Sequence, residues 1–331
     1  MSENVELRVE SVRNIFDDGN HNAFTDLCRF RDDLYLTFRS CPDGHGIFDT
    51  SCIVVLRSPD GGEWEEVFRF DVPLRDTRDP HFLVFQDRLI VYTGTWLVAT
   101  SDGSRDLNDH LGYAAWSEDG ANWRGPQWLE GTYGHYIWRA AAHGDKAYLC
   151  GRRTREFVPQ HMAADASKQR ESALLESEDG LVWRTVGLFE DEYGDETAFL
   201  FEEDGSILAV ARTHGGRPAQ VCRSKPRYKE WTRTALDRYI GGPMLAKWGD
   251  RYLVGGRKAI DKGNPRTTLY WLVNDQLQEI TELPSGGDNS YPGFVELDDT
   301  RGLLSYYSSH EGSGGKEAPA SIYLAGLSLT G

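Results

Sequence analysis

A short turn motif that recurs at a nearly constant spacing restricts the fold of this chain more than any other feature of its sequence. Ser58-Pro-Asp-Gly-Gly-Glu-Trp64 returns at residues 117–123 and 177–183, at spacings of 59 and 60 residues. A fourth copy at residues 224–231 keeps only the serine and the tryptophan. Asp and Gly suit a tight hairpin turn, because Asp accepts hydrogen bonds from nearby backbone N–H groups and Gly tolerates positive φ. A period of this length, built from short strands, is typical of β-propeller blades.

Alignment on the repeat divides the chain into six units, each with an apolar first strand, a polar turn, and a second and a third strand. The predicted first strands are Ala23–Phe30, Phe82–Phe85, Arg139–Ala142, Thr197–Phe201, Met244–Lys247 and Gly293–Leu297. The sixth unit has no room for a fourth strand before Gly331, and the alternating segment Val5–Val12 can supply it. We therefore predict an all-β, six-bladed β-propeller over residues 1–331, a single domain whose ring is closed by the N-terminal strand joining the last blade.

Charge and composition exclude several classes of partner. The formal net charge of −16 argues against general binding to nucleic acid, whose affinity comes largely from phosphate neutralisation. No apolar run reaches about 18 residues and no signal peptide is visible at the N-terminus. The five cysteines are an odd number without a Cys-x-x-Cys pair, which favours free thiols in a reducing compartment. We expect a cytoplasmic protein with no nucleic-acid or membrane partner and no metal or other cofactor.

Chemically active residue types gather at one topological position of the predicted propeller. The starts of the first strands and the ends of the second strands lie on one face, and the repeated turns lie on the opposite face. The residues on the first face are His21, Arg78, Asp79, Trp138, Arg139, Glu196, Asp288 and Tyr291 before first strands, and Arg39, Arg152, Arg212, Arg257 and His310 after second strands. Arginines therefore end a second strand in four of the units.

An arginine-lined mouth in an acidic protein predicts an anionic ligand, most simply a carboxylate held by bidentate pairs. The alternative is that the arginines only pair with the acidic residues of the rim, which are Asp79, Asp195, Glu196 and Asp288. Trp138 also has two interpretations, because it can stack on a sugar ring or pack between blades. No spacing of His, Asp and Glu in the chain is specific for a metal ion.

Three Asp-box turns in six units resemble the sialidase superfamily, and the resemblance covers essentially the whole chain. Residues Asp195–Arg212 resemble the sialidase strand pair that opens with a catalytic glutamate and closes with a carboxylate-binding arginine. Residues Ser290–Asp299 resemble the strand that carries the tyrosine nucleophile. The resemblance implies that Glu196 polarises Tyr291 for attack on the anomeric carbon, while Arg212 holds the substrate carboxylate. A neutral phenol, with an ordinary pKa near ~10, needs such a base to become a nucleophile.

The same resemblance implies two further roles. Arg257 falls near the third carboxylate-binding arginine of the family. The acid/base aspartate of the family lies in the loop before the third strand of the first blade, which here spans Ser40–Ser51. We take Asp49 as the proton donor, with Asp43 and His45 as alternatives.

Four segments near the mouth differ from sialidases or add to the resemblance. The first arginine of sialidases, in an Arg-Ile-Pro sequence, is replaced by His21–Leu27, so the arginine triad is incomplete. Arg78-Asp79-Pro80 resembles the Arg-Asp-Pro segment of five-bladed glycosidase propellers, in which the aspartate helps to fix the sugar. Segments His21–Leu27, Ser285–Gly293 and Ser305–Glu311 also resemble sialidase-like bacterial proteins of unassigned substrate.

The sequence therefore predicts an exo-acting glycoside hydrolase for a small anionic saccharide, such as a uronate, a sialate or a sulfated sugar. The expected catalytic residues are Tyr291, Glu196, Asp49 and Asp79. The expected substrate-binding residues are Arg39, Arg139, Arg212 and Arg257 for the anion, with His21, His45, Arg78, Arg152, Asp288, His310 and Trp138. One alternative is a polysaccharide lyase in which a His/Tyr pair abstracts the C5 proton of a uronate. The other is a non-catalytic sugar-binding propeller.

Overall fold

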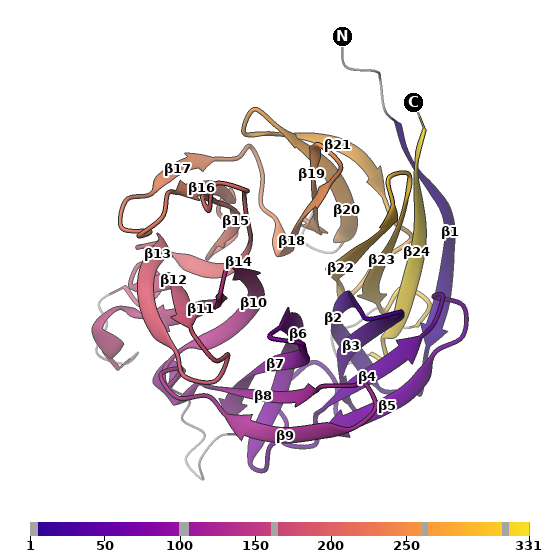
Figure 1. The fold of residues 1–331 in the computed structure, drawn as a ribbon, viewed down its shortest axis with the longest axis horizontal. Coiled ribbons are helices and arrows are strands. Elements are labelled where there is room, and N and C mark those ends of the chain that lie inside the picture. The colour runs from indigo at the N-terminus through magenta and orange to yellow at the C-terminus, as the bar shows by residue number, and fades with distance from the viewer. Residues whose placement is uncertain (1–5, 99–105, 160–164, 260–263, 313–317, 331) are drawn as a thin grey trace.

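In the computed structural model, short strands form six antiparallel sheets of four strands each around a central axis (Figure 1). The structure describes residues 6–98, 106–159, 165–259, 264–312 and 318–330. Each sheet is one blade, and its strands pair in order from the axis outward. The predicted all-β, six-bladed propeller is therefore confirmed.

The strands occupy equivalent positions in the blades. The innermost strands are β2 (His21–Phe30), β6 (Arg75–Phe85), β10 (Tyr136–His143), β14 (Gly194–Phe201), β18 (Gly241–Trp248) and β22 (Asn289–Asp298). The second strands are β3 (Asp33–Cys41), β7 (Arg88–Leu97), β11 (Lys146–Thr154), β15 (Ile207–Thr213), β19 (Arg251–Lys258) and β23 (Arg301–Ser308). The third strands are β4 (Cys52–Ser58), β8 (Leu111–Ser117), β12 (Arg170–Ser177), β16 (Gln220–Ser224), β20 (Arg266–Val273) and β24 (Ser321–Thr330). The outer strands are β5 (Glu65–Phe70), β9 (Trp123–Trp128), β13 (Arg184–Glu190), β17 (Thr232–Ala235), β21 (Gln276–Glu282) and β1 (Glu6–Phe16). Two short 3₁₀ helices, η1 (Leu107–Asp109) and η2 (Arg155–Phe157), complete the described elements.

The N-terminal strand closes the ring, as predicted. Strand β1 pairs with β24 in antiparallel orientation and is the outer strand of the last blade. Strands β1 and β24 accordingly lie side by side in Figure 1. The observed strand is longer than the predicted segment, because pairing continues to Phe16, which lies opposite Ile322. This pairing covers the edge of β24 and gives the last blade the same four strands as the others.

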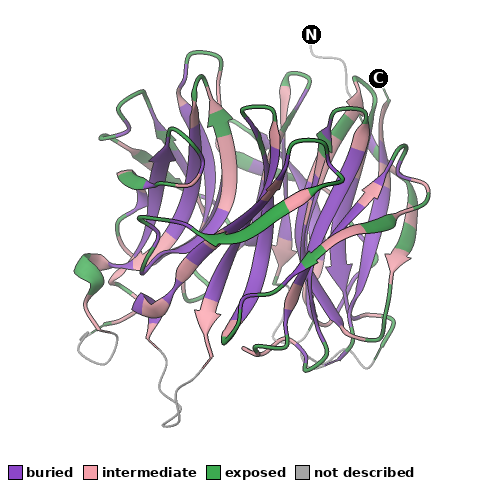
Figure 2. Cartoon of the chain, turned by 60° about the horizontal axis from the view of Figure 1, so that its bottom comes forward, coloured by how far each residue is buried: buried purple, intermediate pink, exposed green. Residues whose placement is uncertain are grey.

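The hydrophobic core lies between neighbouring blades rather than at one centre. One cluster joins Phe38 of the first blade to Leu324 of the last, and another joins Tyr92 of the second blade to Leu175 of the third. Figure 2 shows the buried residues along the strands and the exposed ones in the turns. Strands covered by a blade on each side must be apolar on both faces, which explains their nearly continuous apolar sequences.

The repeated Ser-Asp-Gly turns lie between the third and outer strands and attach each blade to the one before it. In the second turn, Asp119 Oδ1 accepts hydrogen bonds from the backbone N–H groups of Ala121 and Asn122, at 2.9 and 2.7 Å. Its glycine packs against the preceding blade, since a Cβ atom at Gly120 would lie 1.8 Å from the hydroxyl of Tyr35. The turns are therefore structural, on the face opposite the predicted mouth.

This packing predicts that Gly120→Ala is strongly destabilising. Gly120 has a φ of +80°, so an added methyl group both strains the backbone and meets Tyr35. We expect a loss of roughly 3 kcal/mol in the free energy of unfolding, measured by urea denaturation. Gly19→Ala is the matched control, because Gly19 has the same φ and nothing within 4 Å, and it should cost about 1 kcal/mol. Equal losses in the two variants would contradict the packing argument.

All six innermost strands contain a β-bulge near their first residues. In β6, Arg78 pairs with Gly94 but His81 pairs with Tyr92. Over this stretch β6 advances by three residues and β7 by two, so β6 contains one extra residue. The same shift occurs in the other five innermost strands. The residues inside the shifts are Phe24 and Thr25, Asp79 and Pro80, Trp138 and Arg139, Asp195 and Glu196, Gly242 and Pro243, and Tyr291 and Pro292. Bulges redirect side chains and are common beside active sites.

Two further findings concern membrane-spanning helices and cysteines. Among the described residues, no helix is long and apolar enough to cross a membrane. All five cysteines are free thiols, and Cys41, Cys150 and Cys222 are buried.

Candidate active site

Tyr291 and Glu196 meet at the mouth of the propeller, although 95 residues separate them in the sequence. The Tyr291 hydroxyl donates a hydrogen bond to Glu196 Oε1 at 2.7 Å. Glu196 Oε2 accepts from Arg212 Nη1 at 2.7 Å and from the backbone N–H of Gly242 at 3.1 Å. Arg212 Nη1 also lies 3.4 Å from the Tyr291 hydroxyl. The structure therefore brings together the phenol, carboxylate and arginine that the sequence predicted to act together.

The backbone at these positions is held in an uncommon conformation. Tyr291 has a φ of 52°, and Phe24 and Asp79, at equivalent bulges, have φ values of 63° and 51°. Positive φ is rare for residues other than glycine and is concentrated at functional sites. Gly242 allows the close approach of the Tyr291 ring, since a Cβ atom there would lie 2.6 Å from it. Sequence reasoning placed Gly242 at a strand start but did not assign it to the site.

The electrostatic surroundings keep the Tyr291 hydroxyl protonated until a base removes its proton. Tyr291 is 5% exposed, and burial raises the pKa of its phenol well above the usual value. The nearby charge of Glu196 acts in the same direction, whereas Arg212 and Arg257 oppose it. The guanidinium carbon of Arg257 lies 5.7 Å from the centre of the Tyr291 ring. A neutral phenol bonded to a carboxylate is the arrangement that general-base activation requires.

Arg212 and Arg257 flank the phenol and remain partly open to solvent. Each has 20% of its side chain exposed. Arg257 Nη1 lies 3.2 Å from Asp288 Oδ1, and Arg212 Nε lies 3.5 Å from Asp195 Oδ2. Arg152 also binds Asp195, at 2.7 Å. The acidic rim proposed as an alternative is thus present, but the partly exposed guanidinium groups leave a positive surface beside Tyr291.

Arg39 and Arg78 share one carboxylate that sequence reasoning missed, that of Asp76. Arg39 is fully buried, with Nε and Nη2 at 3.0 and 2.7 Å from Asp76 Oδ1. It also donates to the carbonyls of Gly44 and Gly46, at 3.0 and 2.9 Å. Arg78 Nε donates to the other oxygen of Asp76. Arg39 therefore anchors the loop after β3 from beneath, where a ligand does not reach it.

Arg139 and Trp138, on the innermost strand β10, contact Tyr291 or its neighbour Pro292. Trp138 is buried, with its ring edge-on to Tyr291 at 6.0 Å, so it packs between blades and has no surface for stacking on a sugar. Arg139 Nη1 donates to Asp26 at 2.9 Å and Nη2 to the carbonyl of Pro292 at 2.6 Å. Arg139 and Asp26 also line a cavity of about 190 Å³ below Tyr291. Arg139 thus supports the strand that carries Tyr291.

Asp79 is a buried acid beside the nucleophilic pair. One of its oxygens accepts a hydrogen bond from the hydroxyl of Tyr136, and the other is buried without a partner among the described residues. Burial, reinforced by the charge of Glu196, raises the pKa of Asp79 to about 8. Asp79 is therefore neutral at pH 7, in position to act as a hydrogen-bond donor.

Asp79→Asn should remove a pH dependence of stability. The raised pKa means that the folded chain holds a proton on Asp79 that the unfolded chain releases near pH 4, so this contribution to stability is full below pH 4 and is lost as pH rises through about 8. At pH 8 we expect the free energy of unfolding of Asp79→Asn to exceed that of the wild type by roughly 1 to 4 kcal/mol, so that the variant unfolds at a higher temperature. At pH 4 we expect little difference. The exposed Asp32, changed to Asn, is the control in thermal scans. A constant difference across pH would contradict the assignment.

His21, His45 and Asp288 form a third group at the mouth. Asp288 Oδ2 lies 2.9 Å from His21 Nε2 and 2.6 Å from His45 Nδ1, while its other oxygen faces Arg257. Three ligand atoms within 4.8 Å of one another are also a possible metal site. However, two ligands of one zinc ion lie roughly 3.3 Å apart at Zn–N and Zn–O distances of about 2 Å. The shorter separations and the guanidinium of Arg257 favour hydrogen bonds over a bound dication.

Three predicted site residues have no contact with the Tyr291 cluster among the described residues. Asp49 is exposed and has no hydrogen bond there. Asp43 is exposed and accepts a hydrogen bond from Thr50, at 2.5 Å. His310 Nδ1 lies 2.8 Å from Ser308 Oγ, and its ring packs 5.1 Å from that of Tyr323. The assignment of Asp49 as proton donor stays a prediction without support from these contacts.

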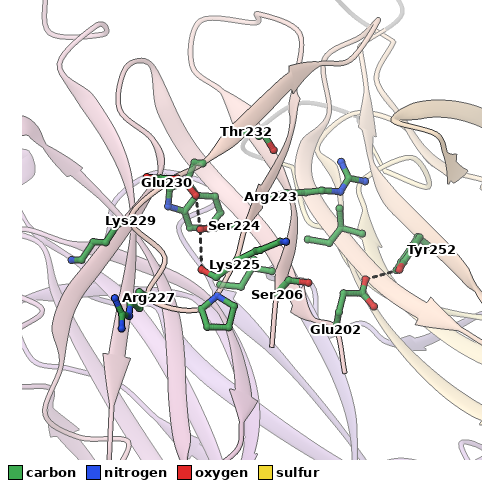
Figure 3. A pocket seen from close by; sticks show the side chains of 14 residues that line it. Glu202, Ser206, Arg223, Ser224, Lys225, Arg227, Lys229, Glu230, Thr232 and Tyr252 are labelled. Carbon is green, nitrogen blue, oxygen red and sulfur yellow. Dashed lines mark hydrogen bonds between the residues drawn. The ribbon is translucent and has the colours of Figure 1, made fainter. Parts of the chain in front are cut away.

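A groove of about 1050 Å³ lies elsewhere, between the fourth and fifth blades (Figure 3). It is lined by residues such as Glu202, Arg223, Trp231 and Tyr252, at the strand ends opposite the mouth. Two of its charged groups have partners: Glu202 accepts a hydrogen bond from Tyr252 at 2.5 Å, and Arg223 lies 2.6 Å from Asp275. Because it contains no buried acid–base pair, we place the chemistry at the mouth.

Comparisons with known proteins bear on the fold. No family model matches the chain, and no curated protein matches it. Among solved structures, Trypanosoma rangeli sialidase in complex with the inhibitor DANA aligns with a TM-score of 0.70 and 12% identity, over 98% of this chain and 60% of that chain. A mutant of NanB sialidase from Streptococcus pneumoniae aligns with a TM-score of 0.69 and 12% identity, over 96% of this chain and 71% of that chain.

A third neighbour belongs to another class of glycosidase. The Bombyx mori GH32 beta-fructofuranosidase BmSUC1 aligns with a TM-score of 0.55 and 12% identity, over 95% of this chain and 61% of that chain. The present chain spans about 60% of the length of the Trypanosoma rangeli sialidase. At these identities the alignments show the fold alone. The chain is therefore a six-bladed β-propeller with the sialidase fold.

Proposed function

We propose that this protein is a glycoside hydrolase that removes a small anionic sugar from the end of a larger saccharide. The observation that carries the proposal is the 2.7 Å hydrogen bond from the Tyr291 hydroxyl to Glu196, at the base of a mouth flanked by Arg212 and Arg257. Any hydrogen-bond acceptor would satisfy the hydroxyl of a buried tyrosine, so the stability of the fold does not require a carboxylate at this position. A carboxylate held by two other donors is a fixed base.

The chemistry follows from these positions. As Tyr291 Oη attacks the anomeric carbon, its proton passes to Glu196, and the bond to the leaving oxygen breaks. Water then attacks the same carbon and releases Tyr291, to which Glu196 returns the proton. The attacking water loses one proton and the leaving oxygen gains one, so that one water is consumed for each bond cleaved. A related Trypanosoma rangeli sialidase structure holds 2,3-difluorosialic acid as a covalent intermediate, which supports a covalent step of this kind.

The substrate class follows from the charge of the mouth. Arg212 and Arg257 are partly exposed, and their guanidinium groups suit a planar carboxylate. The Trypanosoma rangeli sialidase has been observed with sialic acid, an anionic sugar. In this chain His21 stands where sialidases are expected to carry their first arginine, and it binds Asp288 rather than offering a positive charge. A uronate or a sulfated sugar is therefore as suitable a substrate as a sialate.

The test is a screen of glucuronides, galacturonides, sialosides and sulfated glycosides with two readouts. Hydrolysis releases a free sugar and adds no unsaturation. A lyase acting on the same uronides produces an unsaturated uronate with new ultraviolet absorbance, and this result would favour the alternative reaction. Saturable binding without any product would instead favour a sugar-binding propeller. Digestion and mass spectrometry after reaction with a fluorinated analogue of the cleaved sugar should find the added mass on Tyr291.

A further inference from the structure

We propose that His45, oriented by Asp288, is the group that protonates the leaving oxygen and later activates water. This inference rests on the proposed hydrolase function and concerns the part of the reaction that Tyr291 and Glu196 do not supply. An alcohol leaving group with no proton donor departs slowly, so an acid at the mouth is required. The geometry points to an imidazole instead of the aspartate expected in this loop.

His45 is fixed on one side and open on the other. Its Nδ1 lies 2.6 Å from Asp288 Oδ2, while Nε2 has no hydrogen-bond partner among the described residues. Its backbone carbonyl accepts from Arg78 Nη2 at 2.8 Å, and the carbonyls of Gly44 and Gly46, its two neighbours, accept from Arg39. The side chain is 27% exposed. Nδ1 is therefore held by the Asp288 carboxylate, whereas Nε2 is free to exchange a proton.

The position of His45 suits the leaving group. The ring of Phe24 lies 5.6 Å from the ring of His45 and 4.9 Å from the ring of Tyr291, so a single aromatic ring separates the two. Tyr291 is buried at the base of the mouth, whereas His45 is partly open to solvent. In an exo-acting enzyme the sugar occupies the base and the leaving group extends outward. A donor at the rim therefore meets the bond that must break.

The other candidate acids fit this role less well. Asp43 and Asp49 are exposed and lack contacts with the cluster, as described above. His21 is buried, and burial lowers the pKa of its imidazole, so it stays neutral and holds Asp288 in place. Asp79 is as buried as Tyr291 and feels the charge of Glu196, so it lies deep in the mouth with the nucleophilic pair, not at the rim. Among these groups, only His45 combines a carboxylate partner with an unpaired ring nitrogen on a partly exposed side chain, since the unpaired Nδ1 of His21 is buried.

The proton transfers balance within the two-step reaction. In the first step, protonated His45 gives its Nε2 proton to the glycosidic oxygen as that oxygen leaves the anomeric carbon, and the alcohol departs neutral. In the second step, neutral His45 takes a proton from the attacking water, whose oxygen displaces Tyr291 from the same carbon. Asp288 keeps its charge throughout and orients the imidazole, as the carboxylate does in a nucleophile–histidine–carboxylate triad. Asp288 is therefore a positioning residue.

The experiment compares leaving groups on the full chain. Methyl and 4-nitrophenyl glycosides of glucuronic, galacturonic and N-acetylneuraminic acid serve as probes, because 4-nitrophenolate leaves without a proton and methanol does not. We expect His45→Gln to lower kcat/KM for the methyl glycoside by at least about 100-fold and for the 4-nitrophenyl glycoside by less than about 10-fold. Asp288→Asn should show the same selectivity in weaker form. His143→Gln, which changes a histidine stacked on Phe201 away from the mouth, is the control.

Four results would overturn the assignment of His45 as the proton donor. Equal losses on the two glycosides, or full activity of His45→Gln on the methyl glycoside, would remove His45 from this step. Nitrogen NMR of the histidine rings provides a readout that needs no substrate: neutral His45 should carry its proton on Nδ1, and a proton on Nε2 would contradict the orientation. Stoichiometric metal bound at His45, found by elemental analysis and lost in His45→Gln, would replace the proton donor by a metal site. No turnover of any probe by the wild type would instead overturn the proposed hydrolase function.

Discussion

Tyr291→Phe should lower kcat by at least about 1,000-fold while leaving the fold and the binding of the anionic sugar nearly unchanged. Removing the nucleophile of a covalent mechanism typically costs this much or more, and the other groups still bind substrate. The phenyl ring keeps the packing against Phe24 and Trp138, at 4.9 and 6.0 Å. The measurement is kcat on the best glycoside of the screen, with binding followed by calorimetry.

A matched control distinguishes loss of the nucleophile from loss of a buried hydroxyl. Tyr306→Phe removes a hydroxyl that donates to the carbonyl of Pro284, in the same blade, from a ring that stacks on Tyr323 and not on Tyr291. It should destabilise the chain by about 1 kcal/mol and leave kcat unchanged. Turnover by Tyr291→Phe at more than about a tenth of the wild-type rate would contradict a covalent role for Tyr291.

The position of each residue relative to the repeated turn explains why the sequence predicted so much of the fold and of the site. The repeated turn assigns each strand end to one face, and every residue at the mouth then follows from its distance to that turn. Glu196 and Tyr291 could be placed together across 95 residues on this basis, and the structure joins them by a hydrogen bond. Periodic local signals are what make such long-range contacts predictable.

The bulges explain what the sequence could not predict. Asp79, Glu196 and Tyr291 lie inside one-residue register shifts, and no local pattern marks an extra residue in an apolar strand. A shift of one residue moves a side chain to the other face of a strand. The direction of Trp138 was ambiguous for the same reason, and burial decides it.

Arg39 illustrates a second limit of prediction from the sequence. At the end of β3 it resembles Arg257 at the end of β19, and both were expected to bind the anion. The difference lies in what covers them: the loop after β3 folds over Arg39 and supplies two carbonyls as acceptors, whereas Arg257 keeps part of its guanidinium exposed. Strand position therefore predicts the face of a residue but not its access to solvent.

Arg257→Lys should weaken recognition of the carboxylate more than it slows the chemistry. Lysine retains the positive charge beside Asp288, and that carboxylate keeps its two histidine partners, so the fold is preserved. An ammonium group lacks the planar pair of N–H donors that a carboxylate prefers. We expect KM for a carboxylated glycoside to rise about 10- to 100-fold with kcat within about threefold of the wild type.

The decisive comparison uses a substrate pair that differs only in the anion. With the carboxamide analogue of the same glycoside, wild type and Arg257→Lys should have similar kcat/KM, because the pair of bonds to the carboxylate is absent in both. Arg238→Lys is the control, since Arg238 binds Asp237 and Glu279 at the outer surface. An equal loss on acid and amide would mean that Arg257 supports Asp288 and Tyr291 without binding the anion. Arg212 would then be the main anion-binding group. The preference of the mouth for a carboxylate would in that case depend on Arg212, which also holds Glu196.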